Sequence, residues 1–415
     1  MKPMLTSYRV LDLGQFVAGP TCARVMAEMG AEVIKVELLP HGDRGRFSGL
    51  KPRGEGMENS SASTYFFQHN HTKKSLAIDY KSDEGRAILF RLIEKSDVLV
   101  ENFAPGVMAR YGLAYEELKK INSGLVMCSI SLAGQTGPLS KEPGFDYIGA
   151  AYAGFTAGIG EPDRGPGQLP NALGDSVTGI TAAMAVGFAL LHREKTGEGQ
   201  HIEASLVDSY FQTQEVNVPK IAMSGKKAVT QRSGSHHPDG GPTGNFRAGD
   251  DTYIAIMVMP YQWPQMTRAL GQPELTQDPR FKSPRDRRAN KEALGNIIET
   301  WMSELGTRDA ALDALRAERV PCAPVLTLDE AIAHPHLVER GTVRAVNDPL
   351  LGDFAVPGMP AKFSAYAAPS DPKAPLLGQD NDELLSGILG MDEEEITALY
   401  NAGTIRRDRL IGAKE

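Results

Sequence analysis

Short apolar runs alternate with helical patterns through the first two hundred residues. Residues 8–13 form one apolar run, residues 31–37 form the next, and a helix is expected between them from Pro20 to Met29. Pro20 suits a first helical position, where its missing N–H needs no partner. Further strands are expected at residues 75–79, 98–101 and 125–128. Because parallel strands are joined by crossover helices, this alternation predicts an α/β fold with a doubly wound, Rossmann-like parallel sheet.

The pattern changes in the second half of the chain. A helix rich in Ala, Gly and Met follows Gly174, and we expect it to be buried because it is apolar nearly all round. Gly, Ser, His and Pro then dominate residues 225–244, which marks the passage into a smaller α+β domain. We predict a large domain over residues 1–210, a small domain over residues 225–328 and a C-terminal segment over residues 329–415 that returns to the large domain.

The composition argues against several classes of protein. Of the 415 residues, 41% are hydrophobic and 23% are charged, which favours large folded cores. The net charge of −8 argues against a nucleic-acid-binding protein, because such proteins carry a basic surplus. The three cysteines lie far apart without CxxC spacing, so neither a disulfide scaffold nor a zinc knuckle is predicted.

Neither a signal peptide nor a membrane span is predicted. The first residues lack a long apolar stretch and a small-residue cleavage site. The longest nearly apolar run, residues 179–191, is shorter than the roughly 20 residues that span a bilayer. We therefore expect a cytoplasmic protein whose partners include no membrane and no nucleic acid.

The loop over residues 14–20 is the first candidate binding site. It follows a strand and leads into a helix, so its backbone N–H groups are able to face an anion. Gly14 and Gly19 do not form a GxGxxG pattern, which disfavours an NAD site with Glu37 as the ribose-binding acid. An ordinary strand-to-helix turn is the simpler alternative. Asn102 also follows a strand, and the carboxyl ends of such strands meet at one crevice.

Motifs for metals, ATP and serine nucleophiles are not found. His69 and His71, like the pair His236 and His237, lack a third ligand at a recognisable spacing, so no metal site is predicted. The chain contains neither a GxSxG elbow nor a P-loop.

Asp175 is the strongest candidate for chemistry. It lies beside Gly174 at the expected start of the apolar helix. One interpretation makes Asp175 an N-cap that accepts a backbone N–H. The other makes it a nucleophile toward an activated acyl group, because the helix dipole and N–H donors keep its carboxylate ionised. The two interpretations are compatible.

A series of motifs carries a family resemblance over nearly the whole chain. The segments are residues 10–13, 18–20, 30–37, 73–75, 97–103, 143–146, 174–176, 196–200 and 321–325. In their order they resemble the class III coenzyme A transferases, the CaiB/BaiF family that includes formyl-CoA transferase and carnitine CoA-transferase. The resemblance implies an enzyme whose substrate is a coenzyme A thioester, with no permanently bound cofactor and no metal.

The resemblance also implies a site and an assembly. Asp175 matches the nucleophile of the family's Gly-Asp motif. The positions expected to contact coenzyme A are Val17, Ala18, Ile78, Lys81, Asn102, Phe103 and Arg110. The positions expected to line the acyl pocket are Tyr65, Phe145, Asp146 and the glycine-rich lid at Gly240 and Gly241. The implied assembly is an interlocked homodimer in which two chains pass through each other like links.

Three positions depart from formyl-CoA transferase. Val17 stands where that enzyme has Gln, Leu38 where it has Arg, and Phe145 where it has Tyr. In the 2-methylacyl-CoA racemases of the same superfamily, a catalytic His occupies the place of Phe145, directly before the acid that matches Asp146. A phenyl ring cannot relay a proton, which argues against racemase chemistry here.

The implied reaction is reversible transfer of CoA from an acyl-CoA to a free carboxylic acid through a covalent aspartyl intermediate. Succinyl-CoA is the expected donor by analogy, with dicarboxylic or branched acceptors. Backbone N–H groups near Asp175 and in the lid are expected to stabilise oxyanions. The alternatives are a racemase or epimerase, and a non-catalytic acyl-CoA-binding subunit of a larger complex.

Overall fold

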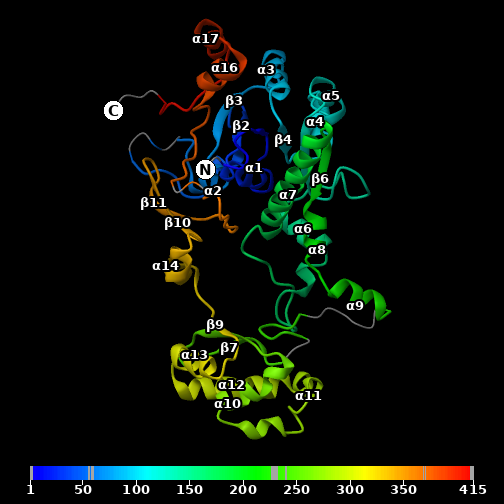
Figure 1. The fold of residues 1–415 in the computed structure, drawn as a ribbon, viewed down its shortest axis with the longest axis vertical. Helices are drawn as coiled ribbons and strands as arrows, with labels where there is room; N and C mark the ends of the chain where they lie inside the picture. The colour runs from blue at the N-terminus through cyan, green and yellow to red at the C-terminus, as the bar shows by residue number, and fades with distance from the viewer. Residues whose placement is uncertain are drawn as a thin grey trace. The chain divides into compact units, whose positions relative to one another are not determined.

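The computed structural model describes residues 3–54, 57, 60–225, 232–238, 241–367, 369 and 371–411. Its chain divides into two compact units (Figure 1). Unit 1 comprises Met1–Ala153, Leu169–Gln214 and Pro335–Glu415, and unit 2 comprises Gly154–Gln168 and Glu215–His334. Residues 154–168, predicted to lie in the large domain, therefore group with unit 2. The division into domains stays a prediction.

Unit 1 is built on a six-stranded parallel sheet, which confirms the predicted α/β class. Its strands are β1 (Arg9–Asp12), β2 (Glu32–Leu38), β3 (Lys74–Ile78), β4 (Val98–Glu101), β5 (Val126–Ser131) and β6 (His201–Ser205). The strand order is β3-β2-β1-β4-β5-β6. The order reverses between β1 and β4, and in doubly wound sheets ligands bind beyond the strand ends at such a switch point.

Two apolar layers cover the sheet. One contains Leu11 of β1 and packs against α3 (Asp83–Glu94) and the C-terminal helices α16 (Asn381–Leu389) and α17 (Glu393–Ala402). The other contains Val10 and packs against α1 (Ala18–Glu28) and α7 (Leu173–Thr196). Because neighbouring residues of a strand point to opposite faces, Val10 and Leu11 serve different layers.

From Pro335 onward the C-terminal segment belongs to unit 1, whereas residues 329–334 group with unit 2. Direct hydrogen bonds join the part in unit 1 to β3 and to the residue that follows it. The backbone N–H of Ala77 donates to Asn381 Oδ1 at 2.9 Å, and that of Asp79 donates to the carbonyl of Thr404 at 2.8 Å. Figure 1 shows α16 and α17 next to the β3 edge. The remaining elements of unit 1 are α2 (Thr64–Asn70), α4 (Val107–Arg110), α5 (Tyr115–Ile121), α6 (Asp146–Tyr152), α8 (Leu206–Gln212), α15 (Pro335–Glu339), β10 (Val343–Asp348), β11 (Gly352–Pro357) and the 3₁₀ turn η1 (Arg44–Phe47).

Helix α7 differs from its prediction. The face that packs against α1 is buried, and Gly179 permits this approach because a Cβ there would lie 2.7 Å from the Ala18 carbonyl oxygen. Ile180, Met184 and Phe188 on another face are exposed, so the single chain does not bury α7 all round. By length and composition alone, α7 is long and apolar enough to cross a membrane.

Unit 2 has a separate core of its own. A three-stranded sheet, ordered β7-β8-β9, packs with Trp263 and Ile298 of the surrounding helices. Its elements are η2 (Thr156–Gly158), α9 (Asn217–Met223), β7 (Thr243–Arg247), β8 (Tyr253–Met257), η3 (Pro260–Gln262), α10 (Trp263–Ala269), η4 (Pro273–Thr276), α11 (Pro284–Ala289), α12 (Lys291–Leu305), α13 (Arg308–Ala317), β9 (Cys322–Pro324) and α14 (Leu328–Ala333).

Candidate active site

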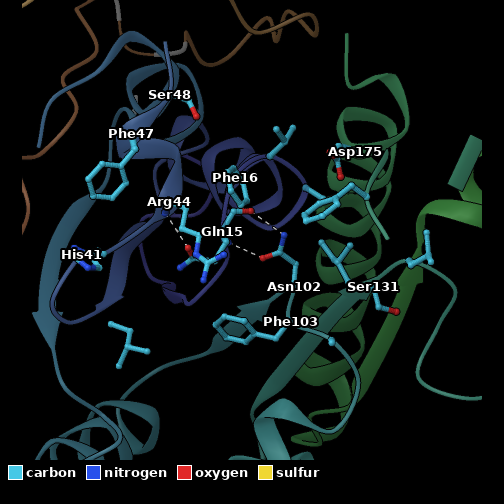
Figure 2. Close-up of a pocket in the computed structure, with 18 of the residues that line it drawn as sticks. Gln15, Phe16, His41, Arg44, Phe47, Ser48, Asn102, Phe103, Ser131 and Asp175 are labelled. Atoms are coloured by element: carbon cyan, nitrogen blue, oxygen red, sulfur yellow. Dashed lines mark hydrogen bonds between the residues drawn. The ribbon is translucent and has the colours of Figure 1, made fainter. Parts of the chain in front are cut away.

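A cavity of about 1110 Å³ opens in unit 1 at the switch point of the sheet (Figure 2). Its lining comes from the loops after β1, β2, β3, β4 and β5 and from the first turn of α7. Seven residues expected at the site line it, namely Val17, Ala18, Lys81, Asn102, Phe103, Phe145 and Asp175. The fold therefore gathers positions that lie up to 158 residues apart in sequence, between Val17 and Asp175.

The loop after β1 is held by reciprocal hydrogen bonds. Asn102 accepts from the Gln15 N–H at 2.6 Å and donates from Nδ2 to the Gln15 carbonyl at 2.9 Å (Figure 2). A Cβ at Gly19 would lie 3.1 Å from Asn102 Oδ1, so a larger residue would crowd this pair. Phe16 adopts a φ of 60°, and its N–H donates to Asp43 Oδ1 at 3.0 Å. These bonds fix the direction of the loop that faces the cavity.

A buried ion cluster supports this loop from behind. Lys35 Nζ lies 3.0 Å from Asp43 Oδ2 and 3.4 Å from Asp12 Oδ2, and Lys73 Nζ donates to Asp12 at 2.7 Å. Burial alone would raise the pKa of Asp12, but the two lysines outweigh it and hold the pKa below its ordinary value. The Asp12 carboxylate stays charged and accepts the Gly14 N–H at 2.8 Å. The cluster is structural, because it anchors the start of the loop.

Asp175 lies in the first turn of α7 and its main chain is tightly held. Its N–H donates to Asp146 Oδ1 at 2.7 Å, and Tyr210 Oη donates to Asp146 Oδ2 at 2.8 Å. A Cβ at Gly174 would lie 2.1 Å from the Tyr210 ring, so only glycine fits before Asp175. The N-cap of α7 is Ala172, so the interpretation of Asp175 as the N-cap is wrong. Because the Asp175 N–H is bonded to Asp146, it is not free to face an oxyanion. Stabilisation of an oxyanion by other N–H groups near Asp175 stays a prediction.

The charge on Asp175 also differs from its expectation. Burial and the neighbouring Asp146 carboxylate raise the pKa of Asp175 to about 7. We expected the helix N-terminus to keep Asp175 fully ionised. In the structure, loss of water and a like charge instead favour the protonated form. Near neutral pH, Asp175 therefore exchanges between a protonated and an ionised form.

Four predicted residues lie outside the cavity lining in unit 1. Ile78 is fully buried in β3, and Arg110 is exposed at the end of α4. Asp146 is buried under the Asp175 main chain. Burial raises the pKa of Tyr65 to about 12, and the Asp175 charge contributes to this shift. Tyr65 and Asp146 thus interact with Asp175 without lining the cavity.

Of the two predicted lid glycines, the structure describes only Gly241, which does not line this cavity. Gly241 belongs to unit 2, where its carbonyl accepts from Arg287 Nε at 3.1 Å. Gly240 lies outside the described residues. The lid stays a prediction.

Several residues that line the cavity were not predicted from the sequence. They are Gln15, Phe16, Leu38, Leu39, Pro40, His41, Gly42, Arg44, Phe47, Ser48, Tyr80, Ala104, Ile130, Ser131, Leu132, Gly144 and Leu206. Gln15 and Phe16 lie inside the loop already singled out, and Leu38 was noted only as a departure. The loop after β2 carries no motif, and only the sheet order shows that it faces Asn102.

Comparison with known proteins decides the family. The sequence profile described as CoA-transferase family III matches residues 5–381. This chain belongs to CoA-transferase family III. A relative from Chloroflexus aurantiacus, named succinyl-CoA–D-citramalate CoA-transferase, is 33% identical over 396 residues, covering 95% of this chain and 96% of that protein.

Two further similarities agree with the family. The beta subunit of a succinyl-CoA–L-malate CoA-transferase from the same organism is 33% identical over 407 residues, covering 97% of this chain and 98% of that protein. The crystal structure of a CaiB/BaiF family protein from Brucella suis has a TM-score of 0.82 and 31% identity, covering 94% of this chain and all of that one. The family III chain described here is a CoA-transferase, and coenzyme A thioesters are substrates of its family.

Proposed function

We propose that this CoA-transferase moves CoA from an acyl-CoA to a free carboxylic acid through covalent intermediates on Asp175. The observation that carries the proposal is the position of Asp175, the only Asp or Glu among the described residues that line the cavity. Its main chain is fixed by Asp146, so its carboxyl group is presented at one place. An ionised carboxylate is a competent nucleophile toward a thioester.

Four steps complete the proposed reaction without net consumption of water. The Asp175 carboxylate attacks the thioester carbonyl, the C–S bond breaks, and CoA thiolate leaves a mixed anhydride. The thiolate attacks the aspartyl carbonyl, which releases the donor acid and leaves an aspartyl-CoA thioester. The acceptor carboxylate attacks that thioester and again expels thiolate. The thiolate finally attacks the acceptor's carbonyl, which forms the product and regenerates Asp175.

The raised pKa of Asp175 serves this exchange in two ways. Weakly solvated carboxylates are stronger nucleophiles, and the low-water surroundings that raise the pKa also protect the anhydride from hydrolysis. The attacking form is the ionised one. The rate of acylation is therefore expected to rise with pH through the pKa of about 7.

The substrates are proposed from the relatives and from the charges in the cavity. Both named relatives use succinyl-CoA, so we propose succinyl-CoA as the donor. Arg44 and Lys81 line the cavity with exposed side chains, which suits the phosphates of coenzyme A. Val17, Ala18, Asn102 and Phe103 remain proposed coenzyme contacts, and so do Ile78 and Arg110 outside the lining.

The proposed assembly is a homodimer of interlocked chains. The apolar face of α7 that includes Ile180, Met184 and Phe188 is exposed, and a second copy of the chain would bury it. One relative is named as a beta subunit, so a heteromeric assembly is the competing outcome. Light scattering on the purified chain should give twice the mass of the 415-residue protein, and a monomeric mass would contradict the homodimer.

A trapping experiment tests the covalent step. The enzyme is incubated with succinyl-CoA and then with hydroxylamine, which converts an aspartyl thioester or anhydride to a hydroxamate. Mass spectrometry should place the hydroxamate on Asp175. Its absence with every donor that supports turnover would contradict the mechanism. Exchange of an α-proton with deuterated water, without an acceptor acid, would instead favour the racemase alternative.

A further inference from the structure

Glu101, at the end of β4, is a buried carboxyl group that the proposed mechanism does not use. It is 3% exposed, and no lysine or arginine in the described part of the chain forms an ion pair with it. Burial raises the pKa of Glu101 to about 7, although hydrogen bonds from Ser129 and the Phe103 N–H oppose the rise. Burying an unpaired carboxyl group costs free energy, whereas Asp12 is balanced by two lysines. Stability alone therefore does not explain the presence of Glu101.

A chain of hydrogen bonds across three neighbouring strands orients this carboxyl group. Ser129 of β5 is paired with Glu101 in the register of the sheet, and its hydroxyl hydrogen-bonds to Glu101. Ser129 Oγ also lies 2.9 Å from Nε2 of His201 in β6. The ring of Tyr115 from α5 stacks on the His201 ring, with centroids 5.4 Å apart and an angle of 17°. The side of Glu101 that faces β5 is thereby fixed.

The other bond of Glu101 leads to the cavity. Its Oε2 accepts the Phe103 N–H at 2.8 Å, across the turn that begins with Asn102. Asn102 and Phe103 both line the cavity, whereas Glu101 does not (Figure 2). Asn102 in turn holds the main chain of Gln15 through its two reciprocal bonds. One buried carboxyl group therefore holds the turn after β4, and through Asn102 the loop after β1 as well.

We propose that Glu101 is a positioning residue for coenzyme A, whose carboxyl group holds Asn102 and Phe103 in the conformation that receives the coenzyme. The inference rests on the proposed function, since it takes Asn102 and Phe103 to be coenzyme contacts. Without this hold the turn has more conformations, so coenzyme binding has to order it and becomes weaker. Asp175 belongs to α7, so the chemical step is not affected.

Two substitutions of Glu101 separate its bond from its bulk. Glu101→Met keeps the length of the side chain but removes the acceptor for the Phe103 N–H. Glu101→Gln keeps an oxygen acceptor for that N–H. A serine hydroxyl both donates and accepts, so Ser129 can accept from the glutamine amide and donate to His201 Nε2. The glutamine variant should therefore rescue most of what the methionine variant loses.

Two measurements follow coenzyme binding apart from the chemistry. Calorimetric titration gives the Kd of free coenzyme A, and exchange of radiolabelled succinate into succinyl-CoA gives KM and kcat without any other acid. In Glu101→Met, the Kd for coenzyme A and the KM for succinyl-CoA should rise by about tenfold or more, while kcat and the KM for succinate stay within about twofold. In Glu101→Gln, the rise should stay below about threefold. An unchanged Kd in Glu101→Met, or an equal rise in both variants, would overturn the proposal.

Glu203 of β6 offers a matched control. Like Glu101, it is paired with Ser129 in the register of the sheet, and its Oε2 accepts a backbone N–H, that of Gln135, at 2.9 Å. Glu203 is exposed, and neither it nor Gln135 lines the cavity. Glu203→Met should therefore leave the Kd for coenzyme A unchanged. A rise equal to that in Glu101→Met would indicate general loosening of the sheet and overturn the specific role of Glu101.

A third variant separates this inference from the proposed function. If Phe103→Ala binds coenzyme A as tightly as the wild type, the proposed coenzyme contact is wrong, and the role of Glu101 is overturned with it. If Phe103→Ala weakens binding and Glu101→Met does not, only the role of Glu101 is overturned. Failure to trap a hydroxamate on Asp175 of the wild type would contradict the covalent mechanism, while the titration with free coenzyme A would still decide the role of Glu101.

Discussion

Two carboxylates in unit 1, the buried Asp12 and the half-buried Asp175, have pKa values shifted in opposite directions. Asp12 has Lys35 and Lys73 within ion-pair distance, and its pKa lies below the ordinary value. Asp175 has Asp146 as its charged neighbour, and its pKa is raised to about 7. Both carboxyl groups lose water on folding. The comparison teaches that the sign of the nearby charge separates an acid that holds a loop from an acid that is suited to react.

The largest expected effect comes from removing the reactive acid. Asp175→Asn should lower kcat by about a thousandfold or more, because the amide cannot attack a thioester. Steady-state assays with succinyl-CoA would measure the loss. The exposed Asp83→Asn is the matched control and should retain activity. An Asp175→Asn enzyme with near-normal kcat would contradict the role of this carboxyl group.

The same variant should change stability in a defined direction. The folded pKa of Asp175 lies above the unfolded value, so the folded protein binds more protons between about pH 4 and pH 7 and loses stability as pH rises there. Asp175→Asn removes this loss. Its thermal midpoint, relative to that of the wild type, should therefore increase from pH 5 to pH 8, and a decrease would contradict the raised pKa.

Breaking the buried ion cluster around Asp12 should mainly lower the stability of the folded protein. Asp12→Asn leaves Lys73 and Lys35 buried without one of their counter-charges, so the free energy of unfolding should fall by about 3–5 kcal/mol. Urea unfolding measures this value. The exposed pair of Asp83 and Arg86 offers the contrast, since Asp83→Asn should cost no more than about 1 kcal/mol. Equal costs at the two positions would contradict the structural role of the cluster.

A smaller effect should follow from removing the like charge beside Asp175. Asp146→Asn keeps an acceptor for the Asp175 N–H but removes the carboxylate that raises the Asp175 pKa. In the pH profile of kcat/KM, the acid limb that reports the Asp175 pKa should therefore move to lower pH. Tyr210→Phe removes the other bond to Asp146 while leaving the charge, and it should not move the limb downward. A downward movement in both variants would assign the effect to geometry instead.

Much of this site follows from local sequence. Alternating apolar runs predict the parallel sheet that the structure contains. The sequence also marks the loop after β1 as a candidate site, but only the structure shows that Asn102 contacts Gln15 in this loop. The sequence also singled out Asp175. It missed Arg44 and its neighbours, because the loop after β2 faces the cavity only through the order β2-β1-β4.

The sequence by itself determined the α/β class, the family and the candidate acid, because hydrophobic periodicity and ordered motifs are local properties of the chain. Only the tertiary structure decided that α7 begins before Asp175, that Asp146 accepts its N–H, and that its pKa rises instead of falling. The physical reason is that burial and neighbouring charge depend on contacts between residues far apart in sequence. Asp146 and Asp175 are 29 positions apart in the chain, yet they are bonded neighbours in the fold.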